Sequence, residues 1–84
     1  MICVKGAFGA GDQMTPELAA RLSQCAERHS ARVHLRCGDK RVRQNSLIGI
    51  LALDLRRGGT FEVIAEDGDA QNAADDIVRL LKGA

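Results

Sequence analysis

The stretch that decides the fold runs from residue 31 to residue 53 and reads ARVHLRCGDKRVRQNSLIGILAL. Apolar residues stand at every second position of residues 33–37, and this period of two is typical of a strand with one buried face. Residues 38–39 then predict a hairpin turn, and residues 40–43 predict the returning strand. Because polar residues ending in Ser46 precede an apolar run, we expect a short capped helix to follow.

The segments outside this stretch predict two more strands and two more helices. Residues 2–8 and 60–65 are short apolar runs bounded by turn residues, as strands are. Thr15, followed by proline and glutamate, predicts a helix start, because its hydroxyl can cap free amides and proline fits the first turn. Asp69 is expected to cap a last helix that Gly83 ends. The order β-α-β-β-α-β-α indicates an α+β fold, with one antiparallel sheet and helices on one face.

Length and composition restrict the class of protein. With 84 residues the chain has room for one domain, residues 1–84, around a single thin core. The longest unbroken apolar run, residues 47–53, has seven residues, whereas a membrane span needs about 20. Residues 1–6 show no secretory signal. We therefore expect a small soluble domain in the cytoplasm.

The charge is unevenly distributed along the chain. Residues 28–57 hold eight basic residues and two acidic ones, whereas residues 58–84 hold two basic residues and six acidic ones. Four arginines occupy outward positions of the predicted hairpin: Arg32, Arg36, Arg41 and Arg43. Such a basic face could meet an acidic partner or a phosphate. The alternative is that these arginines are only the solvated side of two strands.

Cysteines and histidines give no sign of a metal site or an enzyme. Cys3, Cys25 and Cys37 include no Cys-x-x-Cys pair, which argues against a disulfide framework and a zinc knuckle. His29 and His34 have no cysteine or carboxylate at ligand spacing. No cysteine, histidine and carboxylate combination has the spacing of a nucleophile and its base. We therefore expect no metal, no cofactor and no catalytic activity.

From Ala26 to its end the chain resembles HPr, the small phosphocarrier family of the bacterial phosphoenolpyruvate-dependent sugar phosphotransferase system. The motifs that carry the likeness are residues 45–53 (NSLIGILAL), the glycines at 58–59 and residues 67–70 (DGDA), after the hairpin described above. The resemblance implies an open-faced β-sandwich of four antiparallel strands and three helices, the middle one short. That is the order of elements already predicted from the residues.

The chain departs from the family in the loop before the first helix. There HPr reads Gly-Leu/Ile-His-Ala-Arg-Pro, and its histidine carries the phosphoryl group. Here Thr15 occupies the histidine position and Glu17 the arginine position. A threonine hydroxyl cannot form the labile phosphoramidate of a carrier, and a carboxylate disfavours an incoming dianion. We therefore expect no catalytic residue and no histidine relay, as in the paralogue Crh.

The serine of the motif is retained as Ser46. The resemblance implies that an ATP-dependent HPr kinase/phosphorylase phosphorylates it and that the phosphoserine form binds a transcriptional regulator. A phosphate at the first turn of a helix would meet free amides, and Arg43 is expected close by. The alternative is that Ser46 is simply an N-cap, worth about 1 kcal/mol.

The resemblance also implies a protein-docking patch. Three apolar residues match it, and three polar ones are expected around them: Leu47, Ile48 and Leu51, with Arg21, Gln24 and Arg43. Its partners would be phosphotransferase-system proteins or the kinase. The alternative is that the apolar residues belong to the core.

Two rival functions stay open. The chain could be a diverged binding module of the HPr fold without phosphorylation. It could also bind nucleic acid on the basic sheet face, although that face offers no aromatic residue to stack on bases, and phosphate contacts alone would weaken steeply with salt. A phosphocarrier that uses a residue other than a histidine in this loop is disfavoured by Thr15 and Glu17.

Overall fold

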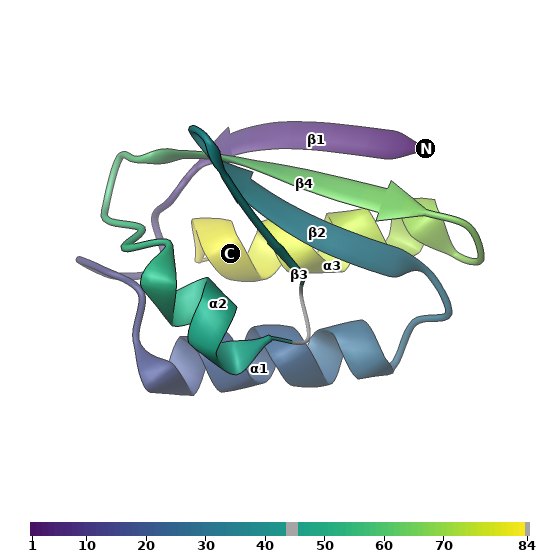
Figure 1. Ribbon diagram of the computed structural model, residues 1–84, viewed down its shortest axis with the longest axis horizontal. Coiled ribbons are helices and arrows are strands. Elements are labelled where there is room, and N and C mark those ends of the chain that lie inside the picture. The colour runs from purple at the N-terminus through teal and green to yellow at the C-terminus, as the bar shows by residue number, and fades with distance from the viewer. Residues whose placement is uncertain (44–45, 84) are drawn as a thin grey trace.

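The computed structural model describes residues 1–43 and 46–83 (Figure 1). Its elements follow the predicted order: β1 (Ile2–Ala7), α1 (Pro16–Glu27), β2 (Arg32–Cys37), β3 (Lys40–Arg43), α2 (Leu47–Ala52), β4 (Thr60–Glu66) and α3 (Ala70–Lys82). The four strands form one antiparallel sheet in the order β1-β4-β2-β3, and the three helices cover one of its faces. The predicted α+β open-faced sandwich is confirmed. In the described residues no helix is long and apolar enough to cross a membrane.

The core lies between the sheet and the helices. Alternate residues of β2 and β4 point into it, which confirms the period-two pattern of the hairpin. The largest fully buried side chains come from both layers: Phe8, Leu22, Leu35, Ile50, Val63, Ile77 and Leu81. Most are aliphatic, as predicted, although both phenylalanines are also buried.

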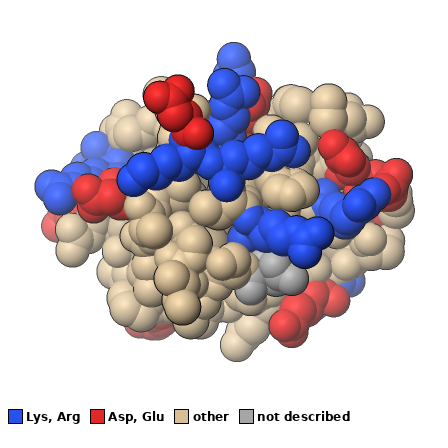
Figure 2. Space-filling view, in the orientation of Figure 1, with Lys and Arg blue, Asp and Glu red and all other residues tan. Residues whose placement is uncertain are grey.

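The other face of the sheet is open and carries the arginines that were predicted to point outward from the hairpin. The register places Arg36 between Glu62 of β4 and Arg41 of β3, and His34 beside Arg43. Figure 2 shows lysine and arginine side chains crowded over β3, next to an uncharged area over α2. The arginines of the hairpin are therefore outward strand residues, but Glu62 lies 3.7 Å from Arg36 and reduces the positive charge of this face.

Two of the predicted helix ends have the expected chemistry. The Thr15 hydroxyl accepts a hydrogen bond from the Leu18 backbone N–H at 3.1 Å, with Pro16 in the first turn of α1. Helix α3 ends at Gly83, whose φ of 80° is the left-handed conformation that glycine adopts without strain.

The predicted cap of α3 is wrong in one respect. Asp69 stands at the N-cap position, but its side chain makes no capping hydrogen bond. Its Oδ1 instead accepts from the backbone N–H groups of Ser30 at 3.0 Å and Ala31 at 3.2 Å. The carboxylate therefore holds the turn after α1, because the fold brings that turn against the start of α3.

Candidate functional site

The loop before α1 is fixed by backbone hydrogen bonds to the segment before β4. Gln13 forms an isolated antiparallel bridge with Arg56, and the Met14 N–H donates to the Leu55 carbonyl at 2.7 Å. Met14 is buried. The loop thus places Thr15 beside an open hollow of about 620 Å³, lined chiefly by residues of the loop and the first turns of α1.

Thr15 and Glu17 occupy this site without the chemistry of a phosphohistidine. The Thr15 hydroxyl is engaged as the helix cap, and the exposed Glu17 carboxylate pairs with Arg21 at 3.3 Å. Neither histidine reaches the loop, because His29 follows the far end of α1 and His34 lies in the middle of β2. The arrangement offers a hydroxyl and a carboxylate where the resemblance to HPr implies an imidazole and a guanidinium.

Ser46 begins α2 as predicted. Its hydroxyl oxygen accepts a hydrogen bond from the Gly49 N–H at 3.2 Å, and its own N–H donates to the Arg43 carbonyl at 3.1 Å. The side chain acts only as an acceptor in this cap, and the residue is half-buried. Ser46 therefore caps α2 while the residue as a whole stays partly open to solvent.

Gly49 allows this close packing. A Cβ atom at Gly49 would lie 2.9 Å from the Ser46 hydroxyl oxygen and 3.2 Å from the Val42 Cβ. Only a residue without a side chain leaves both contacts undisturbed. The glycine of the motif thus has a packing reason that the sequence pattern did not show.

The apolar residues of α2 divide between core and surface. Ile50 is fully buried and Leu51 is half-buried against the core. Leu47 keeps 42% of its surface exposed and Ile48 keeps 84%. Two members of the predicted docking patch are therefore open to solvent.

The three polar residues predicted around this patch are all exposed: Arg21, Gln24 and Arg43. Arg21 and Gln24 lie on α1, which packs against α2. Arg43 ends β3 and lies opposite His34, so its side chain is on the open face of the sheet. Asn45, part of the motif that carries the resemblance, lies outside the described residues.

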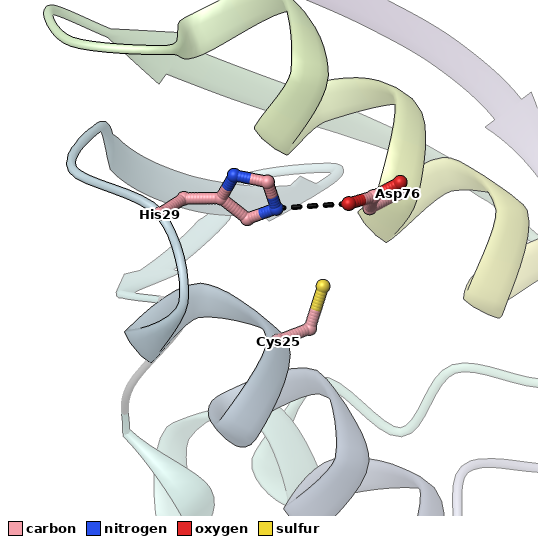
Figure 3. A group of neighbouring side chains, drawn as sticks. All are labelled: Cys25, His29 and Asp76. Carbon is pink, nitrogen blue, oxygen red and sulfur yellow. Dashed lines mark hydrogen bonds and ion pairs between the residues drawn. The ribbon is translucent and has the colours of Figure 1, made fainter.

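A second cluster was missed by the sequence analysis. Cys25, His29 and Asp76 bring a sulfur, an imidazole nitrogen and a carboxylate oxygen within 4.8 Å of one another (Figure 3). The prediction that His29 has no cysteine or carboxylate at ligand spacing is therefore wrong. The one available signal was the four-residue spacing of Cys25 and His29, which puts them one helical turn apart. Asp76 is far away in sequence and only the packing of α3 against α1 brings it near.

The environment of this cluster shifts three pKa values. The hydrogen bond that the His29 Nδ1–H donates to the Asp69 carboxylate raises the pKa of His29 above its usual 6.5, against a smaller opposing effect of burial. The same contact lowers the pKa of Asp69 to about 2. Burial, followed by the negative charge of Asp76, raises the pKa of the Cys25 thiol. The cluster therefore favours an imidazolium between carboxylates and a protonated thiol when nothing is bound.

His34 has the opposite surroundings. Burial and the neighbouring Arg41 and Arg43 lower its pKa. Its Nδ1 is buried and has no hydrogen-bond partner within residues 1–43 and 46–83. A neutral imidazole in the middle of the open sheet face follows from these contacts.

Comparison with known proteins identifies the family. The family model described as PTS HPr component phosphorylation site matches residues 15–83. The chain belongs to the HPr family. Its relatives are the phosphocarrier proteins of the sugar phosphotransferase system. No curated protein sequence matches this HPr-family chain.

Solved structures agree on the fold. HPr-C-His from Thermoanaerobacter tengcongensis is 24% identical with a TM-score of 0.89, over 98% of this chain and 92% of that one. The phosphocarrier protein HPr from Bacillus anthracis is 21% identical with a TM-score of 0.89, over 95% of each chain. The Bacillus subtilis catabolite repression containing protein Crh is 24% identical with a TM-score of 0.77, over 98% of this chain and 90% of that one. This HPr-family chain is thus similar in fold to carriers and to Crh alike.

Proposed function

We propose that this chain is a regulatory or docking member of the HPr family, phosphorylated on Ser46, and that it is neither a histidine phosphocarrier nor an enzyme. The observation that carries the proposal is the contrast between the two helix starts. Thr15 replaces the histidine that carries the phosphoryl group and Glu17 replaces the arginine beside it, whereas Ser46 keeps its motif and stands beside exposed apolar residues. A chain built this way retains the regulatory serine and loses the relay.

The surroundings of Ser46 suit a phosphate. The hydroxyl hydrogen is not used by the cap, because the oxygen accepts from the Gly49 N–H. After transfer of a phosphoryl group from ATP to this oxygen, the hydroxyl proton leaves and the new dianion faces the free amides of the first turn of α2. No acidic residue stands in that first turn. Phosphorylation would therefore change the charge of the surface without destabilising α2.

The docking surface consists of the exposed apolar residues next to this serine. Leu47 and Ile48 offer apolar area on a face that Figure 2 shows to be uncharged over α2. Arg21 and Gln24, exposed on α1, lie on the neighbouring helix. A phosphate on Ser46 would add two negative charges at the edge of this patch, which is how one modification could select between partners. The partners that fit are an HPr kinase/phosphorylase, other phosphotransferase-system proteins and a transcriptional regulator of the cytoplasm.

The proposal is tested by intact mass after two parallel incubations of the full chain. One contains phosphoenolpyruvate and enzyme I, and the other contains ATP and an HPr kinase/phosphorylase. We expect one added phosphate in the ATP sample and none in the phosphoenolpyruvate sample. Ser46→Ala should abolish the addition, and Ser23→Ala, which removes a serine of helix α1, should leave it intact. A histidine-carrying HPr serves as the positive control for both incubations.

Two results would contradict the proposal. Phosphate from phosphoenolpyruvate would show that the loop at Thr15, or one of the histidines, still accepts a phosphoryl group. No phosphate in the ATP sample, with an active control, would leave a binding module of the HPr fold without phosphorylation.

Nucleic-acid binding is the weaker alternative. The outward arginines of β2 and β3 could contact phosphates, but Glu62 and Glu66 share the same open face through β4. No phenylalanine, tyrosine or tryptophan lies on that face, since both phenylalanines are buried in the core and the chain has neither of the other two. Retention of single-stranded RNA at physiological salt would favour this alternative.

A further inference from the structure

The second cluster lies away from α2, between the end of α1 and the middle of α3. Figure 3 shows Cys25 on the last turns of α1, His29 on the segment that follows this helix and Asp76 facing them from α3. Their sulfur, nitrogen and oxygen donor atoms all lie within 4.8 Å of one another. These are the three ligand types that zinc takes in proteins. The packing of two helices thus gathers a mixed ligand set that no contiguous motif contains.

The imidazole of His29 is held in the orientation that a metal ligand needs. Its Nδ1 is hydrogen-bonded to Oδ2 of Asp69, and Oδ1 of Asp69 is in turn fixed by the backbone N–H of Ser30 at 3.0 Å. Nε2 consequently points at Oδ2 of Asp76, 2.9 Å away. A carboxylate on the far nitrogen of a histidine is the usual outer contact of a zinc-binding histidine, since it fixes both the tautomer and the direction of the ring.

Asp76 is also oriented from its other side. Its Oδ1 lies 3.7 Å from Nη1 of Arg79, one turn along α3, whereas Oδ2 is the oxygen that faces His29. One oxygen is therefore engaged at the surface and the other is directed at the cluster. Arg79 reduces the negative charge of this carboxylate but does not occupy the oxygen that a cation would use.

The donor atoms are close to the spacing that a four-coordinate ion imposes. Bond lengths of about 2.0–2.3 Å at tetrahedral angles put the ligand atoms about 3.3–3.6 Å apart. The pair at 2.9 Å would open by a few tenths of an ångström, and the widest pair would close by about 1.3 Å at most. Rotation of the side chains covers such changes without moving a helix.

Solvent reaches the cluster from one side. Cys25 is only 7% exposed, but it and Asp76 line an open hollow of about 410 Å³ together with Gln24, Arg28 and Leu80. This hollow gives an ion an entry path and gives a water molecule room to complete four ligands.

We propose that Cys25, His29 and Asp76 bind one zinc ion, with water as the fourth ligand and Asp69 as the positioning residue of His29. Binding forms the Zn–S bond and releases the thiol proton of Cys25 to solvent, along with the imidazole Nε2 proton where His29 is protonated. The ion ties the C-terminal end of α1 to α3. It acts on the stability of the domain and is independent of any phosphorylation at Ser46.

The test uses the reduced full chain without a histidine tag, treated with a chelator and then titrated with Co²⁺. We expect one ion per chain, a sulfur-to-cobalt charge-transfer band and the intense visible bands of a four-coordinate ion. Zn²⁺ should displace Co²⁺ and raise the melting temperature. Cys25→Ser should remove the charge-transfer band and weaken Zn²⁺ binding about 100-fold, whereas Cys3→Ser, an exposed cysteine of β1, should change neither. Asp69→Asn should weaken binding about 10-fold.

Other results would overturn the proposal. A band that survives Cys25→Ser, or that disappears in Cys3→Ser, would place the thiolate ligand elsewhere. No saturable binding of one ion would mean that the cluster is only an ion pair of His29 with two aspartates. Because a serine at the buried position 25 could disturb folding, Cys25→Ala is compared by circular dichroism, and its melting temperature should stay unaffected by Zn²⁺.

Discussion

Asp69 and His29 are joined across 40 residues of sequence by a hydrogen bond between the Asp69 carboxylate and Nδ1 of the imidazole. The other oxygen of the same carboxylate accepts the backbone N–H groups of Ser30 and Ala31. One side chain therefore ties the end of α1, the turn that enters β2 and the start of α3. Three segments that the sequence pattern treats separately depend on it.

Removing this carboxylate should destabilise the whole domain. Asp69→Ala leaves two backbone N–H groups and the His29 imidazole without their acceptor, so we expect a fall in melting temperature of several degrees. Asp75→Ala is the matched control, since Asp75 is an exposed carboxylate of α3 that accepts a hydrogen bond from the Gln71 side chain four residues away. Equal melting temperatures for the two variants would show that the hydrogen bonds of Asp69 do not hold these segments together.

The same contact predicts a stability maximum in mildly acidic solution. The raised pKa of His29 means that its contribution is complete below about 6.5 and is lost as the pH rises through the folded-state pKa. The lowered pKa of Asp69 means that its contribution is present above 3.8 and is lost as the pH falls towards about 2. The pair therefore stabilises the fold most between about pH 4 and 6.5.

Urea unfolding across this range, with a chelator present, measures the effect. The difference in free energy of unfolding between the native chain and His29→Gln should be largest in that window and shrink on both sides. His34→Gln should not reproduce this profile, because burial and arginines lower the pKa of His34. A difference that stays constant from pH 4 to 9 would refute the coupling.

Much of the fold could be predicted from local pattern, because its main signals are local. The alternation through residues 33–37, the Thr15-Pro16 helix start and the Ser46 cap are each decided within a few residues and are confirmed. The role of Asp69 could not be predicted in the same way. An aspartate before a helix has the composition of a cap, and only the position of Ser30, brought close by the fold, draws its carboxylate away.

The candidate site divides along the same line. Position in the motif predicted that Ser46 caps α2 and that Ile48 is exposed, because both features are decided within this short helix and its first turn. The Cys25, His29 and Asp76 cluster needs α3 packed on α1, and no spacing in the chain encodes that distance. Local features were thus predictable, whereas those made by helix packing were not.

Substitutions at Ser46 should separate its capping role from its charge. Ser46→Ala removes the acceptor of the Gly49 N–H and should cost about 1 kcal/mol of unfolding free energy. Ser46→Asp keeps an acceptor at the helix start and adds negative charge there, so its stability should stay close to that of the native chain. Thermal unfolding of the two variants checks this order. A much lower melting temperature for Ser46→Asp would argue against the placement of a phosphate at this helix start.

Gly49→Ala should be destabilising for a steric reason. The added Cβ would lie 2.9 Å from the Ser46 hydroxyl oxygen and 3.2 Å from the Val42 Cβ, so the cap or β3 has to move. We expect a loss of about 1–3 kcal/mol in unfolding free energy. A double-mutant cycle with Val42→Ala, which removes the Val42 Cγ1 atom that also lies 3.2 Å from the added Cβ, should show a favourable coupling between the two changes. Strictly additive losses would indicate that the contact with Val42 does not matter.

Substitutions at two isoleucines of α2 should differ in their effect on stability, and comparing them separates stability from docking. Ile48 is 84% exposed, so Ile48→Ser should change the free energy of unfolding by no more than about 0.5 kcal/mol. Ile50 lies two residues on and is fully buried, so Ile50→Ala should lower the free energy of unfolding by about 2–5 kcal/mol, because the surrounding side chains cannot fill the cavity that it leaves.

Urea unfolding measures both changes in stability, and the rate at which the kinase phosphorylates Ile48→Ser measures docking. Because only the exposed residue can contact a partner, Ile48→Ser should slow phosphate transfer to Ser46 while the domain stays folded. An unchanged rate would remove Ile48 from the docking surface.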